Sequence, residues 1–195
     1  MKIERIVARL AILLALAEAV LVLLSWLLAA TMTEGVRTLL SADGVRWFFA
    51  HFENMIASPA LAWLLLMAMA GGALWKSGLL QPDGSMNYKR GVVVAAIVLV
   101  FYAGAISWLI LMPHAILLSA TGRLWPSSFS YALLPICAFG TVICSISHGL
   151  VVRRFTSLTD VCSSLCYGIS KSAPALFLYV LFIQFYESLR YVLYS

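Results

Sequence analysis

Five long apolar runs constrain the fold of this chain more than any other feature of its sequence. A hydrocarbon core of about 30 Å takes roughly 20 helical residues to cross. The runs that reach this length cover residues 10–31, 56–75, 91–112, 129–152 and 173–193. Because lipid offers a backbone no hydrogen-bond partners, each run must form a helix. The sequence therefore predicts an all-α integral membrane protein with about five transmembrane helices in a single transmembrane domain over residues 1–195.

The composition excludes a water-soluble fold. Of the 195 residues, 63% are hydrophobic and 11% are charged, and the mean hydropathy is +0.99. Soluble domains have about 45–50% apolar and about 25% charged residues. The net charge of +5 would suggest an anionic partner in a soluble protein, but here the Lys and Arg residues lie in short loops. We therefore expect the lipid bilayer as the partner of this surface, and no nucleic acid.

The distribution of Lys and Arg predicts the orientation of the helices, because cytoplasmic loops carry an excess of positive charge. One group lies in the N-terminal tail and in the loops after the second and fourth runs: Lys2, Arg5, Arg9, Lys76, Lys89, Arg90, Arg153, Arg154 and Lys171. The opposite side has only Arg37, Arg46, Arg123 and Arg190. The sequence therefore predicts a multi-pass protein with a cytoplasmic N-terminus and a C-terminus on the outer side.

The segment 41–54 is predicted to lie in the membrane interface. Its apolar residues recur at i, i+3, i+4 and i+7, namely Val45, Phe48, Phe49 and Phe52. Arg46 and Glu53 lie off this stripe, and Ser41 is placed to cap the helix. This is the pattern of an amphipathic helix whose apolar face enters the lipid.

Glu18 is the most costly residue for membrane insertion. A carboxylate in the middle of a span costs a few kcal/mol on insertion scales and needs a partner or a proton. One interpretation is that Glu18 binds a proton or a cation. The alternatives are a protonated carboxyl that is hydrogen-bonded to a neighbouring helix, or a contact with a partner subunit.

Three further polar residues lie in or beside the third and fourth spans. His114 follows a proline at the outer end of the third span, and His148 lies near the inner end of the fourth. Each histidine is either a polar cap or a proton or ligand site. Ser145 belongs to a set of small residues in the fourth span, which are typical of helix-packing surfaces.

The sequence predicts neither catalysis nor a metal site. It contains no G-x-S-x-G, H-E-x-x-H or Walker motif. No C-x-x-C pattern is present, and Cys162 and Cys166, spaced i and i+4, are a lone pair without histidine partners. We therefore expect no enzyme activity, no metal and no bound cofactor.

Two stretches resemble a known family. Residues 39–47 read LLSADGVRW and are followed by Asn54, a small-residue-rich span and the segment SGLL at 77–80. Residues 111–115 read LMPHA, and ATGR follows at 120–123. These features resemble the N-terminal part of the p-aminobenzoyl-glutamate transporter (AbgT) family over roughly residues 1–150. Relative to that family's SDAG stretch, which falls on residues 104–107, Ala105 replaces the acid and Ser107 stands in the last position.

The resemblance implies a bacterial inner-membrane protein related to cation-coupled transporters of p-aminobenzoyl-glutamate and of antimetabolites. It implies a coupling cation, sodium or a proton, and a homo-oligomer or a larger membrane protein complex. It adds Asn54 and Ser107 to Glu18, His114, Ser145 and His148 as candidates for a transport pathway or a partner contact. Because family members are much longer and the acid is replaced, the alternative is a non-transporting structural or accessory subunit.

Overall fold

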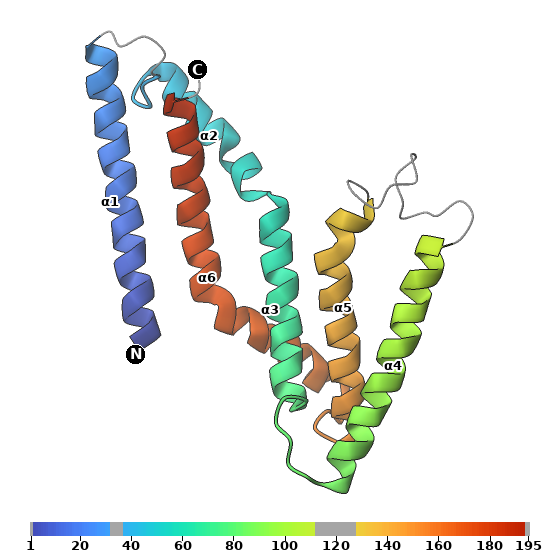
Figure 1. Ribbon diagram of the computed structural model, residues 1–195. Coiled ribbons are helices and arrows are strands. Elements are labelled where there is room, and N and C mark those ends of the chain that lie inside the picture. The colour runs from blue at the N-terminus through green and yellow to red at the C-terminus, as the bar shows by residue number, and fades with distance from the viewer. Residues whose placement is uncertain (1, 32–36, 112–127, 194–195) are drawn as a thin grey trace. The chain divides into compact units, whose positions relative to one another are not determined.

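The computed structural model describes residues 2–31, 37–111 and 128–193. These residues form helices and connecting turns, with no strand among them (Figure 1). In chain order the helices are α1 (Lys2–Ala30), α2 (Ala42–Ile56), α3 (Pro59–Ser77), α4 (Met86–Leu111), α5 (Ser128–Val151) and α6 (Leu158–Leu193). All of them except α2 contain a stretch that is long and apolar enough to cross a membrane. The chain is therefore an all-α, multi-pass membrane protein, as the sequence predicted.

Several helix bounds differ from the predicted spans. Ile56 belongs to α2 rather than to the second span, because the proline at position 59 starts a new helix there. Helix α4, which contains the third predicted span, begins at Met86 rather than at residue 91. The fifth predicted span, 173–193, is the second half of α6, which begins at Leu158. Hydropathy finds the part of a helix that enters lipid, whereas the backbone continues as a helix through more polar residues.

The length of α6 shows that only part of it can lie in hydrocarbon. Its 36 residues correspond to about 54 Å at about 1.5 Å per residue. This is well beyond the roughly 30 Å of a hydrocarbon core. The more polar first half therefore reaches into the interface.

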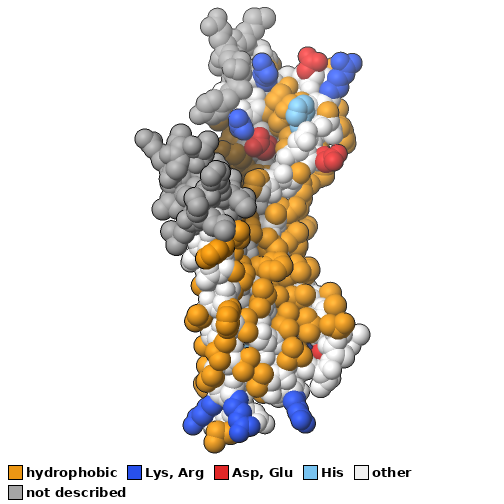
Figure 2. All heavy atoms as spheres, turned by 90° about the vertical axis from the view of Figure 1, so that its right-hand side faces the viewer, with side chains coloured by type: hydrophobic (Ala, Val, Ile, Leu, Met, Phe, Trp, Pro, Cys, Tyr) orange, Lys and Arg blue, Asp and Glu red, His pale blue; other side chains and the backbone are white. Residues whose placement is uncertain are grey.

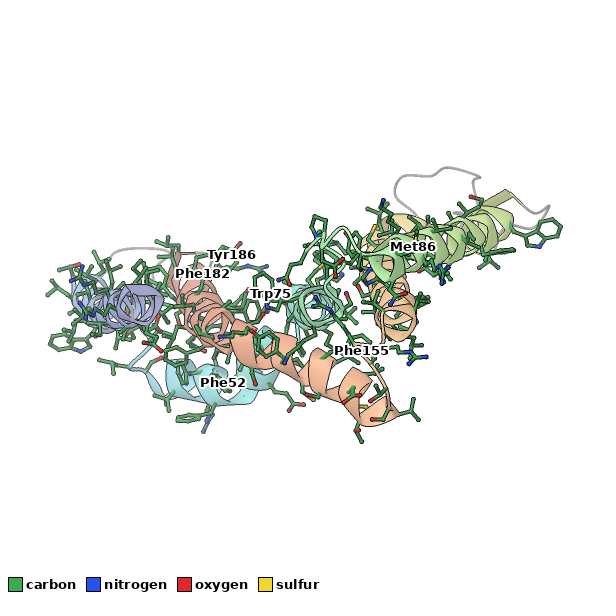
Figure 3. All side chains as sticks on the ribbon, turned by 90° about the horizontal axis from the view of Figure 1, so that it is seen from below. Phe52, Trp75, Met86, Phe155, Phe182 and Tyr186 are labelled. Carbon is green, nitrogen blue, oxygen red and sulfur yellow. The ribbon has the colours of Figure 1, made fainter. Side chains whose placement is uncertain are left out.

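The predicted interfacial helix is confirmed as α2. The Ser41 hydroxyl accepts a hydrogen bond from the backbone N–H of Gly44 at 3.0 Å and caps the helix. Gly44 and Met55 are buried against the protein, whereas Phe49 is 76% exposed. Phe52, which Figure 3 labels on this helix, is also exposed. The predicted apolar stripe therefore faces away from the protein, as expected of side chains that enter lipid.

The chain divides into two compact units, the first made of residues 1–62 and 172–195. Within it, α1 and the C-terminal half of α6 lie side by side (Figure 1). Leu21, Leu39 and Val192 form its buried cluster. The Ser58 hydroxyl hydrogen-bonds the hydroxyl of Tyr179, which joins the short α2–α3 connection to α6.

The second unit comprises residues 63–171. Its helices α4 and α5 pack as an antiparallel pair (Figure 1). The Tyr102 hydroxyl donates to the carbonyl oxygen of Ile136 at 2.8 Å, and its ring covers Gly140. On the face shown in Figure 2, hydrophobic side chains cover the middle of the helices, and charged side chains lie toward the ends. This division of side chains fits spans whose ends lie at the membrane surface.

Helices α3 and α6 meet within the second unit at a pair of glycines. A Cβ placed on Gly72 would lie 2.5 Å from the backbone nitrogen of Gly168, far inside van der Waals contact. The adjacent Gly71 has open space at the corresponding position. Small residues let helix backbones approach this closely in membranes. The sequence dipeptide Gly71-Gly72 therefore has one packing position and one lipid-facing position.

We expect Gly72→Ala to lower the free energy of unfolding by about 1–3 kcal/mol, because the new methyl group overpacks the helix crossing. The matched control is Gly71→Ala, which should leave stability unchanged or raise it by up to about 1 kcal/mol through helix propensity. The measurement is thermal unfolding of the detergent-solubilised protein, followed by helical circular dichroism. Equal effects of the two substitutions would contradict this close crossing.

Candidate functional site

Glu18 lies in a polar cluster between α1 and α6 in the first unit. The hydroxyl of Ser188 donates a hydrogen bond to Oε1 of Glu18 at 2.7 Å. The side-chain amide of Gln184 in turn donates to the Ser188 hydroxyl at 3.2 Å. Ser188 is fully buried. The carboxyl group of α1 is therefore held by a short polar chain on α6.

Helical spacing places these residues on facing sides of the two helices. On α1, Glu18, Leu21 and Ser25 recur at i, i+3 and i+7, and this side is the one that packs against the protein. On α6, Gln184 and Ser188 are four residues apart and share a face. Residues at these spacings are neighbours along one side of a helix. The apolar cluster around Leu21 brings the two polar faces together.

Two oxygens of this cluster are buried without a hydrogen-bond partner among the described residues. They are Oε2 of Glu18 and Oε1 of Gln184. Both are acceptors, and a buried acceptor without a partner costs about 1–3 kcal/mol. Each of these oxygens therefore has an unused capacity to accept a hydrogen bond or to bind a cation.

Ser145 and His148 lie together on one face of α5 in the second unit. His148 is fully buried, and its Nδ1 is 3.2 Å from the carbonyl oxygen of Ser77 at the end of α3. Because a carbonyl can only accept, Nδ1 carries the proton and Nε2 is left as an acceptor. Neither Nε2 of His148 nor Oγ of Ser145 has a partner among the residues that the structure describes.

The surroundings of His148 are those of a packing residue. The edge of the Tyr88 ring lies against it, with the ring centroids 5.3 Å apart. A Cβ on Gly91 would lie 2.8 Å from the imidazole Cδ2 atom. The Tyr88 hydroxyl donates to the carbonyl oxygen of Leu79. His148 therefore joins α3, α4 and α5, and its main role in this structure is to hold the three helices together.

The remaining sequence candidates do not join either cluster. Ser107 lies on α4 and lines an apolar groove of about 690 Å³ formed by α3, α4 and α5. Asn54 is exposed on α2 and does not take part in either cluster. His114 lies outside the described residues.

The chain matches no protein family, no curated protein and no solved structure. Among the described residues, no three His, Cys, Asp or Glu side chains come together as a metal site would require. The chemistry of the site therefore has to be argued from its own groups, above all from Glu18.

Sequence reasoning missed the partners of Glu18. Gln184 and Ser188 are polar residues four apart in an otherwise apolar span, and this spacing is the signal that could have found them. What the sequence lacked was the pairing of α1 with α6. Near the end of α6, Arg190 and the half-buried Glu187 form an ion pair with a distance of 3.7 Å.

We expect Ser188→Ala to destabilise the protein by about 1–3 kcal/mol, because it removes the donor from a shielded carboxyl oxygen. Ser147→Ala is the control, since the Ser147 hydroxyl bonds only the Ile143 carbonyl of its own helix. That control should cost less than about 1 kcal/mol. Thermal unfolding in detergent measures both, and a Ser188→Ala protein as stable as the control would refute the contact with Glu18.

His148→Ala should destabilise the second unit by about 2–5 kcal/mol, because it opens a cavity where three helices meet. His51→Ala is the matched control. His51 is exposed on α2, and its Nδ1 contacts only the Trp47 carbonyl of its own helix. We expect the control to unfold within about 0.5 kcal/mol of the parent, as surface changes do. If both histidine variants unfold alike, the buried imidazole is not a packing residue.

Proposed function

We propose that this chain is a membrane-embedded part of a cation-coupled solute transport assembly in the bacterial inner membrane. In this assembly Glu18 binds the coupling cation, a proton or sodium. The observation that carries the proposal is the pair of buried, unpartnered oxygens on Glu18 and Gln184. Intramembrane acids that face the protein interior mark ion pathways. The resemblance of residues 1–150 to the p-aminobenzoyl-glutamate transporter family supports the same function.

The location of Glu18 distinguishes it from an ordinary anchor residue. Its carboxyl group contacts α6 rather than lipid, and Ser188 orients one of its oxygens. The second oxygen remains available to a cation or a proton. A bound proton would remove the charge of Glu18, and its release would restore that charge between α1 and α6. Charge changes of this kind at a helix contact can bias two arrangements of the helices.

The first test measures solute uptake into proteoliposomes that contain the chain alone. The probe is radiolabelled p-aminobenzoyl-glutamate, with an inward gradient of protons in one series and of sodium in the other. We expect gradient-dependent uptake, and at least a tenfold loss in Glu18→Gln. Glu53→Gln makes the same chemical change at an exposed residue of α2 and should retain uptake.

A second readout does not depend on the identity of the solute. If sodium binds at Glu18, increasing sodium concentration should raise the unfolding temperature of the parent, because a ligand that binds only the folded state stabilises it. If a proton binds, a protonated carboxyl band should appear in the infrared spectrum and vanish in Glu18→Gln. Absence of both signals, in a protein that keeps its helical content, would exclude Glu18 as a cation site.

The accessory-subunit alternative is supported by a different surface. The α4 side of the groove presents the small residues Ala103 and Ser107 four positions apart, and Gly104 beside them has open space. Such a surface lets another helix approach closely. Native mass spectrometry of gently extracted protein separates the two functions. A homo-oligomer favours transport by this chain, whereas a stoichiometric complex with a different protein favours the accessory role.

A further inference from the structure

Two lysines share one aromatic ring at one end of the second unit. The ammonium nitrogen of Lys76, in the last turn of α3, lies 4.8 Å from the centre of the Tyr167 ring. The ammonium nitrogen of Lys171, on α6, lies 5.6 Å from the same centre. Each contact is a cation–π interaction. Two positive charges from two helices therefore converge on one half-buried tyrosine.

The glycine crossing of α3 and α6 fixes this arrangement. Gly72 lies one helical turn before Lys76 on α3, and Gly168 follows Tyr167 directly on α6. The backbones touch at the two glycines. Residues that follow the contact by three or four positions emerge on the same side of their helices. The two lysines are thus placed by the most closely packed backbone contact of the unit, rather than by a flexible loop.

No described acid neutralises these lysines. The acids of the second unit are Asp83 and Asp160, and both are engaged elsewhere. The carboxylate of Asp83 accepts hydrogen bonds from the hydroxyl and backbone N–H of Ser85, which lower its pKa. The carboxylate of Asp160 accepts from the backbone and hydroxyl of Thr156.

The convergence of two like charges has a cost that a bound anion would remove. Two positive charges held against one ring repel each other, and this repulsion is stronger near a membrane than in bulk water. Both lysines are exposed, and their contacts with the aromatic ring offset part of the repulsion. An anionic group between the two ammonium groups would replace the repulsion with two charge-assisted hydrogen bonds.

The position along the helices indicates where that anion comes from. Lys76 lies one residue before the end of an apolar 19-residue helix. The end of a helix of this length lies at the depth of the lipid headgroups. Tyr167 lies in the half of α6 that exceeds the length of a span. Tyrosines at helix ends occupy the headgroup region, and basic pockets between membrane helices bind anionic headgroups.

We propose that Lys76, Lys171 and Tyr167 form a binding site for the phosphate group of an anionic phospholipid. Both ammonium groups donate hydrogen bonds to the phosphate beside the Tyr167 ring. The site is independent of the transport proposal, since it uses none of its residues. It stabilises the crossing of α3 and α6 whenever the surrounding leaflet contains anionic lipid.

The experiment is native mass spectrometry of the full chain in detergent, titrated with phosphatidylglycerol or with phosphatidylcholine. We expect one phosphatidylglycerol to bind at concentrations at least five times lower than those needed for phosphatidylcholine. Lys76→Gln with Lys171→Gln should abolish this preference. The control pair is Lys89→Gln with Arg90→Gln, which removes the same charge from exposed positions of α4 and should keep the preference.

Two further arms complete the test. Lys76→Arg with Lys171→Arg keeps both charges and should retain the preference, provided that both variants keep the helical content of the parent. Inorganic phosphate, added in tenfold excess over the lipid, should not displace it. If phosphate displaces the lipid, the site binds a free anion and the lipid proposal is wrong. Equal preference in the Lys76/Lys171 and Lys89/Arg90 variants would also overturn it, because binding would then follow net charge alone.

Discussion

The absence of water in the hydrocarbon core is the constraint on which the rest of the structure depends. A hydroxyl or amide within a span must find its partner inside the protein. The hydroxyl of Ser25 donates to the Val22 carbonyl and also accepts from the backbone N–H of Leu39, which ties the chain beyond α1 to that helix. Tyr102 reaches from α4 to a carbonyl of α5 in the same way. Polar side chains thus decide where apolar helices meet.

Groups that escape this rule are few among the described residues, and they occur in two pairs. Glu18 and Gln184 each leave one oxygen without a partner in the first unit, and Oγ of Ser145 and Nε2 of His148 lack a partner on α5. The pairs differ in what surrounds them. Three helices close around His148, whereas the carboxyl group of Glu18 has a single donor from one neighbouring helix. Packing between three helices explains why His148 is buried. Packing does not explain the carboxyl group of Glu18, whose second oxygen has no partner among the described residues.

The sequence predicted the parts of the fold that depend on local patterns. Apolar length located the five spans, and the apolar period together with Ser41 located the interfacial helix α2. The start of α6 at Leu158 was missed because the first half of that helix is too polar to register as a span. Glu18 was identified only from the free-energy cost of placing a carboxylate in a membrane span. Its partners on α6 could not be identified, since nothing in the sequence of α1 specifies which of the other helices packs against it.

The contact between Glu18 and Ser188 also has a consequence for how the protein is made. The two residues are 170 positions apart in the chain, which a ribosome covers in roughly 10–30 s at about 5–20 residues per second. Helix α1 therefore enters the bilayer long before its partner exists. During that interval the carboxyl group must remain protonated, stay close to the insertion machinery, or be shielded by another protein. Insertion of α6 ends that exposure, so the contact between α1 and α6 forms only after residue 188 has been made.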